Sequence, residues 1–151
     1  MKQRGFEIVD DLPKDADGNA IVPALPIRST QGAAGYDLCS ISEGMIMPGQ
    51  SVVCRTGVRP YMQSDECLLM YSRSGMGFKH GIVLKNGTGV FDSDFHDEML
   101  VALRNEGNAP YMVHRGDKIA QAVFMHYLTA DEGSYTNSGK KRIGGCGSTG
   151  K

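Results

Sequence analysis

The sequence lacks several features that indicate common classes of protein. Its four cysteines form no C-x-x-C pair and stand beside only four histidines, so no zinc-binding pattern is present. Sixteen basic residues nearly balance seventeen acidic ones, and without a basic excess we expect neither a nucleic-acid nor a membrane partner. No apolar run approaches membrane-spanning length, and the polar opening residues do not resemble a signal peptide. We therefore expect a soluble, cytoplasmic protein with reduced thiols, in which Cys39, Cys54 and Cys67 fill the core or lie at the surface.

Helical periodicity is also scarce, whereas short β-like runs alternate with turn signals. The runs are 51–58, 66–72, 81–86, 98–105, 111–115 and 118–128. This spacing predicts an all-β sandwich or barrel with at most one short helix, at 72–81. The composition becomes polar and glycine-rich after 130, which predicts one β domain over 1–130 and a flexible C-terminal arm over 131–151. Residues 1–28 are open between a strand and a loop.

The arm ends in RIGGCGSTGK, which contains G-x-x-x-x-G-K from Gly145 to Lys151. A P-loop needs a Ser or Thr after the lysine and a helix to follow, and the printed sequence shows neither. The match is either an accident of a glycine-rich tail or a sign that the tail binds phosphate in another way. The basic residues Lys140, Lys141, Arg142 and Lys151 are better suited to one small polyanion than to a long one.

Two segments in the first half of the chain combine residue types that suit chemistry. In AAGYDL (33–38) small residues let the backbone approach a ligand closely beside Asp37, although the segment also reads as a strand that follows a turn. In YSRSGMGFKHG (71–81) Arg73, Ser74 and Gly75 combine a guanidinium, a hydroxyl and free amides, which suit phosphate oxygens. The alternative for this second segment is an ordinary surface turn.

Two later segments are similar in kind. NGTGVFDSDFHDE (86–98) begins with a hairpin signal, and such a hairpin would turn Asn86 and backbone groups toward whatever lies between its arms. Asp92 and Asp94 follow, and two carboxylates near an anion are unfavourable unless a metal or a proton-transfer role explains one of them. A solvated acidic turn is the alternative. In RGDKIAQAVF (115–124) the amide of Gln121 interrupts an apolar strand, which is unremarkable alone.

Taken in order with the glycine-rich tail, these segments resemble the five motifs of the trimeric dUTP pyrophosphatases (dUTPases), and the resemblance runs from 33 to 150. It implies a distorted β jelly roll (β-clip) and a homotrimer whose active sites are shared between subunits. It implies hydrolysis of dUTP to dUMP and pyrophosphate with Mg²⁺, which keeps uracil out of DNA and supplies dUMP for thymidylate. The tail resembles the fifth motif, which folds over the nucleotide of a neighbouring subunit. A phage or bacterial member fits, in the host cytoplasm if a phage encodes it, and some phage members also bind a regulatory protein.

The resemblance also implies roles for single residues. Asp92 matches the carboxylate that deprotonates the attacking water, and Asp37 matches the one that holds Mg²⁺ through water. The positions that match phosphate contacts are Arg73, Ser74, Gly75, Gln121, Arg142, Gly147, Ser148 and Thr149. The positions that match uracil and deoxyribose contacts are Asn86, Gly89, Val90, Phe95 and Cys146.

Three positions depart from the family pattern. Phe95 replaces a tyrosine, which keeps the ring and removes its hydroxyl. Lys118 stands where the fourth motif often has arginine, so a bidentate contact becomes a point charge. Cys146 replaces an aromatic residue that stacks on uracil, which predicts a looser lid and a higher KM.

Two alternatives remain. A dCTP deaminase-like enzyme of the same fold needs a glutamate on the strand after the hairpin, but that place falls at Ala102, and Glu98 lies too early. A non-catalytic regulatory or structural β trimer is the second alternative, and the intact set of motif residues argues against it.

Overall fold

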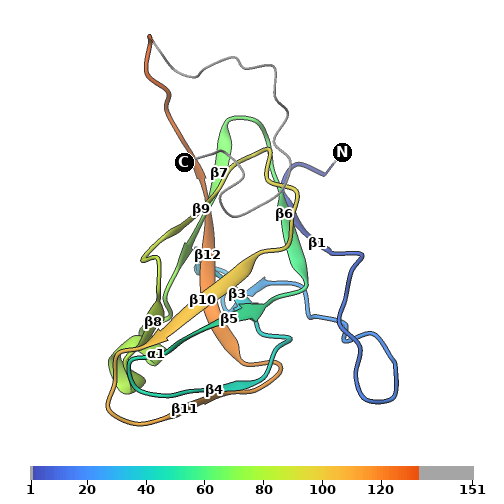
Figure 1. Cartoon of the computed structure of the whole chain (residues 1–151). Coiled ribbons are helices and arrows are strands. Elements are labelled where there is room, and N and C mark those ends of the chain that lie inside the picture. The colour runs from blue at the N-terminus through green and yellow to red at the C-terminus, as the bar shows by residue number, and fades with distance from the viewer. Residues whose placement is uncertain (1, 133–151) are drawn as a thin grey trace.

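The computed structural model describes residues 2–132, and these form an all-β jelly roll with one short helix, as predicted (Figure 1). The strands are β1 (Gly5–Ile8), β2 (Ile27–Arg28), β3 (Tyr36–Cys39), β4 (Gly44–Ile46), β5 (Ser51–Arg55), β6 (Val58–Tyr61), β7 (Glu66–Tyr71), β8 (Ile82–Leu84), β9 (Gly89–Phe91), β10 (Leu100–Asn105), β11 (Tyr111–Val113) and β12 (Lys118–His126), and the helix is α1 (Ser74–His80).

The strands pair in antiparallel fashion in four small sheets. A five-stranded sheet has the order β2-β3-β12-β7-β9, and a three-stranded sheet has the order β5-β10-β8. Two further ribbons pair β1 with β6 and β11 with β4. In Figure 1 the long β12 runs through the middle of the molecule and β10 crosses it diagonally. The main core lies between these sheets, since Leu103 of β10 and Ala122 of β12 belong to one buried cluster.

The alternation of buried and exposed side chains explains why β10 forms a strand. Val101, Leu103 and Asn105 are buried, and Leu100, Ala102 and Arg104 between them are not. Successive side chains of a strand point to opposite faces, so one face of β10 contributes its side chains to the core. Each fully buried aliphatic side chain there stabilises the fold by about 1.5–3 kcal/mol. Among the cysteines, Cys54 and Cys67 are buried and Cys39 is half-buried, as expected of core thiols.

The predicted run 51–58 is two strands. β5 ends at Arg55, and β6 begins at Val58 and pairs with β1 instead. Gly57 between them has φ of 70°, a left-handed conformation that favours glycine, and an added Cβ would lie 2.8 Å from Cγ of Pro23. The bend at Gly57 therefore moves the chain from one sheet to another.

The NGTG prediction needs a similar correction. A turn does follow β8, with the amide of Gly87 donating to the carbonyl of Leu84 at 3.1 Å. The arms β8 and β9 do not pair as a hairpin, because β8 pairs with β10 and β9 with β7. Each arm is thus the edge strand of its own sheet, and each has a second backbone edge that no described strand covers.

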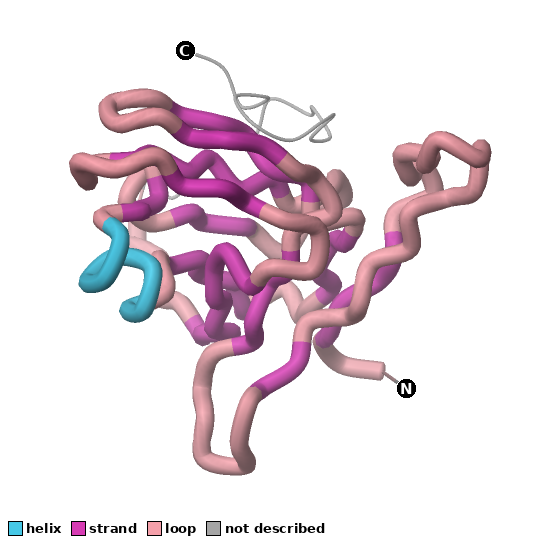
Figure 2. The backbone as a smooth tube through the Cα atoms, turned by 90° about the horizontal axis from the view of Figure 1, so that it is seen from below, coloured by secondary structure: helices cyan, strands magenta, loops and turns pink. Residues whose placement is uncertain are grey.

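The structure defines two segments, 72–81 and 1–28, whose form the sequence pattern does not determine. Residues 74–80 of the predicted short helix or loop form α1, which ends at Gly81 with φ of 67° and buries only Met76. Residues 1–28 contain β1 and β2 and, between them, a loop with a single bridge from Lys14 to Ala20. This loop projects from the body, on the side away from α1 (Figure 2). No helix in the range 2–132 is long and apolar enough to span a bilayer.

Candidate active site

A cavity of about 500 Å³ opens where β3, β12 and β7 lie side by side, next to the start of α1. It brings together five residues that the sequence singled out, which are Asp37, Arg73, Ser74, Gly75 and Gln121. Three separate segments supply them. Their assembly at one place is the structural feature that the order of the motifs alone could not show.

The register of the sheet explains the assembly. Asp37 of β3 is paired with Gln121 of β12, which is paired with Tyr71 of β7. The chain leaves β7 directly after Tyr71 and enters α1 at Ser74, so Arg73 lies at this junction. The three strands therefore place the carboxylate of Asp37, the amide of Gln121 and the segment 73–75, which suits phosphate oxygens, along one row.

The carboxylate of Asp37 is the centre of the charge cluster. Asp37 is 8% exposed. Its Oδ1 accepts a hydrogen bond from Nε of Arg73 at 3.1 Å, and its Oδ2 accepts one from Nζ of Lys118 at 2.8 Å and one from Oγ of Ser29 at 2.9 Å. Burial acts to raise the pKa of Asp37, but the bonds from Lys118 and Ser29 and the nearby positive charges outweigh burial and hold that pKa below its usual range. The carboxylate is therefore ionised at neutral pH.

A β-bulge directs Lys118 into this cluster. Ala120 is opposite Leu38, yet Lys118 is opposite Cys39, so Ile119 is an extra residue in β12. In a regular strand the side chains of Lys118 and Gln121 would point to opposite faces of the sheet, because the two residues are three positions apart. The extra residue reverses that direction, as bulges beside active sites often do. In the sequence Lys118 is marked only as a departure from the fourth motif, and Ser29 lies on no motif, so neither pattern shows their contacts with Asp37.

Arg73 and Gln121 are also held by the chain itself. Nη1 of Arg73 donates to the carbonyl of Lys118 at 3.2 Å, so described residues engage two of its five N–H donors. Nε2 of Gln121 donates to the carbonyl of Ser72 at 3.0 Å. An added Cβ at Gly35 would lie 2.7 Å from Oε1 of Gln121, so a larger residue at this position would displace the Gln121 amide. The remaining donors of Arg73 are available to an anion in the cavity.

The residues predicted to read uracil and to activate water do not line this cavity. They are Asn86, Gly89, Val90, Asp92 and Phe95. They lie at the β8–β9 turn, on β9 itself and in the loop after it, and β9 is an edge strand of the five-stranded sheet. Asn86, Val90 and Asp92 are exposed, whereas Phe95 is 5% exposed and packs edge-on against Phe91 at 4.9 Å between ring centroids.

The register gives the separation of Asp37 and Asp92. Phe91 is paired with Leu68, which places Asp92 beside Cys67, and burial together with the charge of Asp92 raises the pKa of that thiol. From Tyr71 to Cys67 is four residues along β7, and from β3 to β9 is three strand spacings. At about 3.4 Å per residue and about 4.8 Å per strand, the two carboxylates lie roughly 20 Å apart in one chain.

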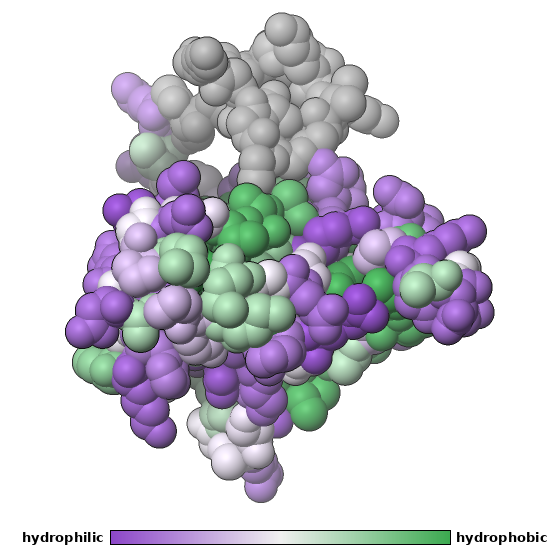
Figure 3. Space-filling view, turned by 60° about the horizontal axis from the view of Figure 1, so that its bottom comes forward, coloured by the Kyte–Doolittle hydropathy of each residue, from purple (hydrophilic) through white to green (hydrophobic). Residues whose placement is uncertain are grey.

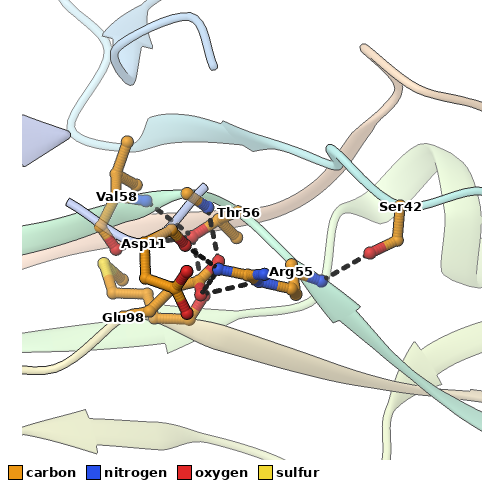
Figure 4. Close-up of polar contacts among 8 residues, drawn as sticks. Asp11, Ser42, Arg55, Thr56, Val58 and Glu98 are labelled. Atoms are coloured by element: carbon orange, nitrogen blue, oxygen red, sulfur yellow. Dashed lines mark hydrogen bonds and ion pairs between the residues drawn. The ribbon is translucent and has the colours of Figure 1, made fainter. Parts of the chain in front are cut away.

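A second polar cluster engages both carboxylate oxygens of Glu98. Oε2 of Glu98 accepts from Nε of Arg55 at 2.9 Å, and Oε1 accepts from the amide of Gly57 at 2.6 Å (Figure 4). Oγ1 of Thr56 donates to the carbonyl of Met99 at 2.6 Å. Both carboxylate oxygens of Glu98 thus anchor the β5–β6 bend to the start of β10.

Direct metal ligation has no candidate in this part of the chain. Across residues 2–132, no three His, Cys, Asp or Glu side chains gather as a metal site. The remaining predicted positions, Arg142, Cys146, Gly147, Ser148 and Thr149, lie outside the described residues.

Known proteins resemble this chain over most of its length. The sequence model of the dUTPase family matches residues 23–150. The deoxyuridine 5'-triphosphate nucleotidohydrolase of Lactococcus lactis is 38% identical over 156 residues, covering 99% of each chain. That of Desulfitobacterium hafniense is 41% identical over 136 residues, covering 85% of this chain and 88% of its own.

Solved structures agree with these sequences. The dUTPase from Streptococcus mutans superposes with a TM-score of 0.72 at 33% identity, over 84% of this chain and 98% of that one. A dUTPase of Staphylococcus bacteriophage 80alpha, described as controlling the transfer of virulence genes, has a TM-score of 0.72 at 18% identity, over 91% of this chain and 100% of that one, which is a likeness of fold. With the family model and relatives of 38–41% identity in agreement, the chain belongs to the dUTPase family, whose members are dUTP diphosphatases.

Proposed function

We propose that the chain hydrolyses dUTP to dUMP and pyrophosphate in sites that two or more copies of the chain build together. The observation that carries this proposal is the distance between its two carboxylates. Asp37 lines the cavity, and Asp92 lies roughly 20 Å away in the same chain, directly after the edge strand β9.

One nucleotide cannot use both carboxylates of one chain. A base that aims water at the α-phosphorus and a carboxylate that holds a metal-bound water each act across one hydrogen bond of about 2.7 Å. A magnesium–oxygen bond adds about 2.1 Å, so the two carboxylates should lie roughly 10–12 Å apart. Asp92 of a second copy must therefore approach the cavity that contains Asp37. A closed homotrimer, with each site shared by neighbours, satisfies this requirement.

The cavity is suited to the triphosphate. The free donors of Arg73, the hydroxyl of Ser74 and the backbone at Gly75 face one space, and phosphate oxygens accept from such groups. Gln121 and Lys118 lie beside them, although Lys118 is engaged with Asp37. The arm residues Arg142, Gly147, Ser148 and Thr149 complete the enclosure in this proposal.

Magnesium bound through water fits the cavity. Mg²⁺ keeps several of its waters and is commonly held by one or two carboxylates and the substrate phosphates. Asp37 is the single carboxylate among the described residues of the lining, and its Oδ1 accepts only one of the two hydrogen bonds it can take. When bound, the ion would offset charge on the departing pyrophosphate.

The edges of β8 and β9 are suited to reading uracil. Backbone N–H and C=O groups along an unpaired strand edge have fixed positions, and they can match the acceptor–donor–acceptor edge of uracil and reject cytosine. Asn86, Gly89 and Val90 lie on or beside these edges. A tight turn there leaves little space for the methyl group of thymine. The ring of Phe95, and Cys146 from the arm, would border the deoxyribose and the base.

Asp92 is the general base of the proposed reaction. It is exposed on the loop after β9, where it can face the cavity of a second copy. It takes a proton from water, the water oxygen bonds to the α-phosphorus, and the bond from the α-phosphorus to the bridging oxygen breaks, which releases pyrophosphate. Such a base contributes roughly 10²–10⁴-fold in rate. The reaction lowers dUTP, keeps uracil out of DNA and supplies dUMP for thymidylate.

The other expectations differ in their support. Deamination of dCTP would need a glutamate at the place of Ala102, and Glu98, which precedes it, anchors the β5–β6 bend. The regulatory protein partner, the cytoplasmic location and the looser lid at Cys146 stay predictions.

The test is release of pyrophosphate from dUTP, dCTP, dTTP and UTP, with and without Mg²⁺. We expect magnesium-dependent release from dUTP alone, and Asp92→Asn should remove it while leaving the fold intact. Equal release from all four nucleotides, or full activity of Asp92→Asn, would contradict the proposal. Formation of dUTP from dCTP would indicate deamination instead.

A further inference from the structure

Ser29 is a polar side chain of the cavity that belongs to none of the five motifs. It directly follows β2, the two-residue strand that pairs with β3, and it lies eight residues before Asp37. Its hydroxyl donates to Oδ2 of Asp37 at 2.9 Å, and Ser29 itself is exposed. An exposed serine bonded to a buried carboxylate contributes little to the core, so its value should lie in what the carboxylate does.

The hydrogen bonds of Asp37 are unequally divided between its two oxygens. Oδ2 accepts from both Ser29 and Lys118, so its two lone-pair positions are filled. Among residues 2–132, Oδ1 accepts only from Nε of Arg73, at 3.1 Å, which leaves one of its lone-pair positions. Ser29 is therefore the group that makes the two oxygens different.

The orientation of the carboxylate plane matters because it decides where each oxygen meets its donors. The terminal torsion of aspartate has a broad energy profile, so the plane turns at small cost unless donors from several directions hold it. Nζ of Lys118 is on a flexible stem and can follow either oxygen. Ser29 lies directly after β2, whereas Arg73 lies between β7 and α1 and Lys118 begins β12. The hydroxyl of Ser29 therefore holds the carboxylate from a third segment of the chain and opposes this rotation.

We propose that Ser29 is a positioning residue of the phosphate site, whose hydroxyl fixes the orientation of the Asp37 carboxylate and, through it, the placement of Arg73 and Lys118 toward a polyphosphate in the cavity. Loss of the hydroxyl leaves Asp37 ion-paired to both cations but free to rotate, so their remaining donors no longer meet the ligand in one fixed arrangement. The inference rests on the proposed function, because it takes the triphosphate as the ligand of this cavity.

The experiment compares Ser29→Ala with Ser29→Thr, which keeps the hydroxyl and adds a methyl group at an exposed position. Ser51→Ala is the matched control, since Ser51 is an exposed serine on β5 that does not line the cavity. The measurements are the Kd for inorganic pyrophosphate by calorimetry, with and without Mg²⁺, the KM and kcat for dUTP, and the Tm. Pyrophosphate binding needs no turnover and reports the cavity directly.

We expect Ser29→Ala to weaken pyrophosphate binding and to raise KM, each by roughly three- to tenfold, which is the range of one typical net hydrogen bond, because Ser29 acts on the ligand only through Asp37. The Tm and kcat should change little, Ser29→Thr should restore wild-type values, and Ser51→Ala should match the wild type. A purely structural role would instead lower the Tm and reduce kcat at constant KM.

Wild-type pyrophosphate affinity in Ser29→Ala, failure of Ser29→Thr to restore it, or no pyrophosphate binding by the wild type would each overturn the inference. Failure of the wild type to cleave dUTP would overturn the proposed function, while the pyrophosphate comparison would still test Ser29. Normal dUTP cleavage with an unaffected Ser29→Ala would overturn the inference alone.

Discussion

Two inactive variants should restore activity when they assemble together. Asp37→Asn removes the carboxylate of the cavity, and Asp92→Asn removes the proposed base after the edge strand β9. Asp92→Asn alone should lose roughly 10²–10⁴-fold in rate. Because the two positions lie roughly 20 Å apart in one chain, we expect each site to take them from two different copies.

The size of the recovery follows from how the copies combine. In an equimolar random mixture, a site works only if the copy that supplies position 37 is the Asp92→Asn chain and its neighbour is the Asp37→Asn chain. Each condition holds for half of the copies, so about one quarter of the sites in a cyclic assembly should be intact. We therefore expect about 25% of wild-type turnover per site, far above either variant alone.

The assay is pyrophosphate release after the two variants are unfolded together and refolded. The control is wild-type protein taken through the same procedure, together with each variant refolded alone. If Asp37→Asn does not refold, the Arg73→Ala variant, which alters the same cavity, can replace it. A mixture no more active than its components would refute the view that sites are shared, and with it the role given to the separation of Asp37 and Asp92.

Three further predictions follow from the structure. Fully buried Asn105 donates to the carbonyls of Ile46 and Ala109 and accepts from the amide of Gly107. Asn105→Ala would leave these groups without their partner, so it should lower the free energy of unfolding, measured by urea titration, by about 2–4 kcal/mol. An unchanged urea midpoint would contradict this prediction. The hydrogen bond from Arg4 lowers the pKa of buried Glu66, although burial opposes this shift. The stability that the ionised Glu66 adds to the fold should be complete at pH values above its unfolded pKa of about 4.3, and it should be lost as pH falls through the lower folded pKa. Thermal unfolding from pH 7 to 2 should show this loss, and Arg4→Met should reduce the pH dependence. Cys146→Phe should lower the KM for dUTP through base stacking of about 1–3 kcal/mol, and unchanged KM and kcat would disprove that idea.

The short strands could be predicted from the sequence because their side chains alternate locally. In β10 every second side chain is buried, so its face could be predicted from residues 98–105 alone. The run 51–58 gave no local sign of its division, because the bend depends on how Gly57 packs against distant Pro23. The divergence of β8 and β9 was hidden for the same reason, since it depends on which other strands pair with each arm.

The candidate site shows the same limit. Asp37, Arg73 and Gln121 could be predicted because they lie in motifs with an order that resembles a known family. Ser29 carries no motif and belongs to the loop after a two-residue strand, so only its bond to Asp37 identifies it. The approach of Lys118 depends on a bulge at Ile119, which exists only in the pairing of β12 with β3. Sequence patterns therefore identified the groups of the site, and long-range pairing determined their arrangement.

The most direct test of the central claim is hydrolysis of dUTP by the wild-type protein with Mg²⁺ in water labelled with heavy oxygen, followed by mass spectrometry of the products. Attack at the α-phosphorus, aimed by Asp92, places the labelled oxygen in dUMP and leaves pyrophosphate unlabelled. Label in pyrophosphate, or dUTP that remains uncleaved, would contradict the account.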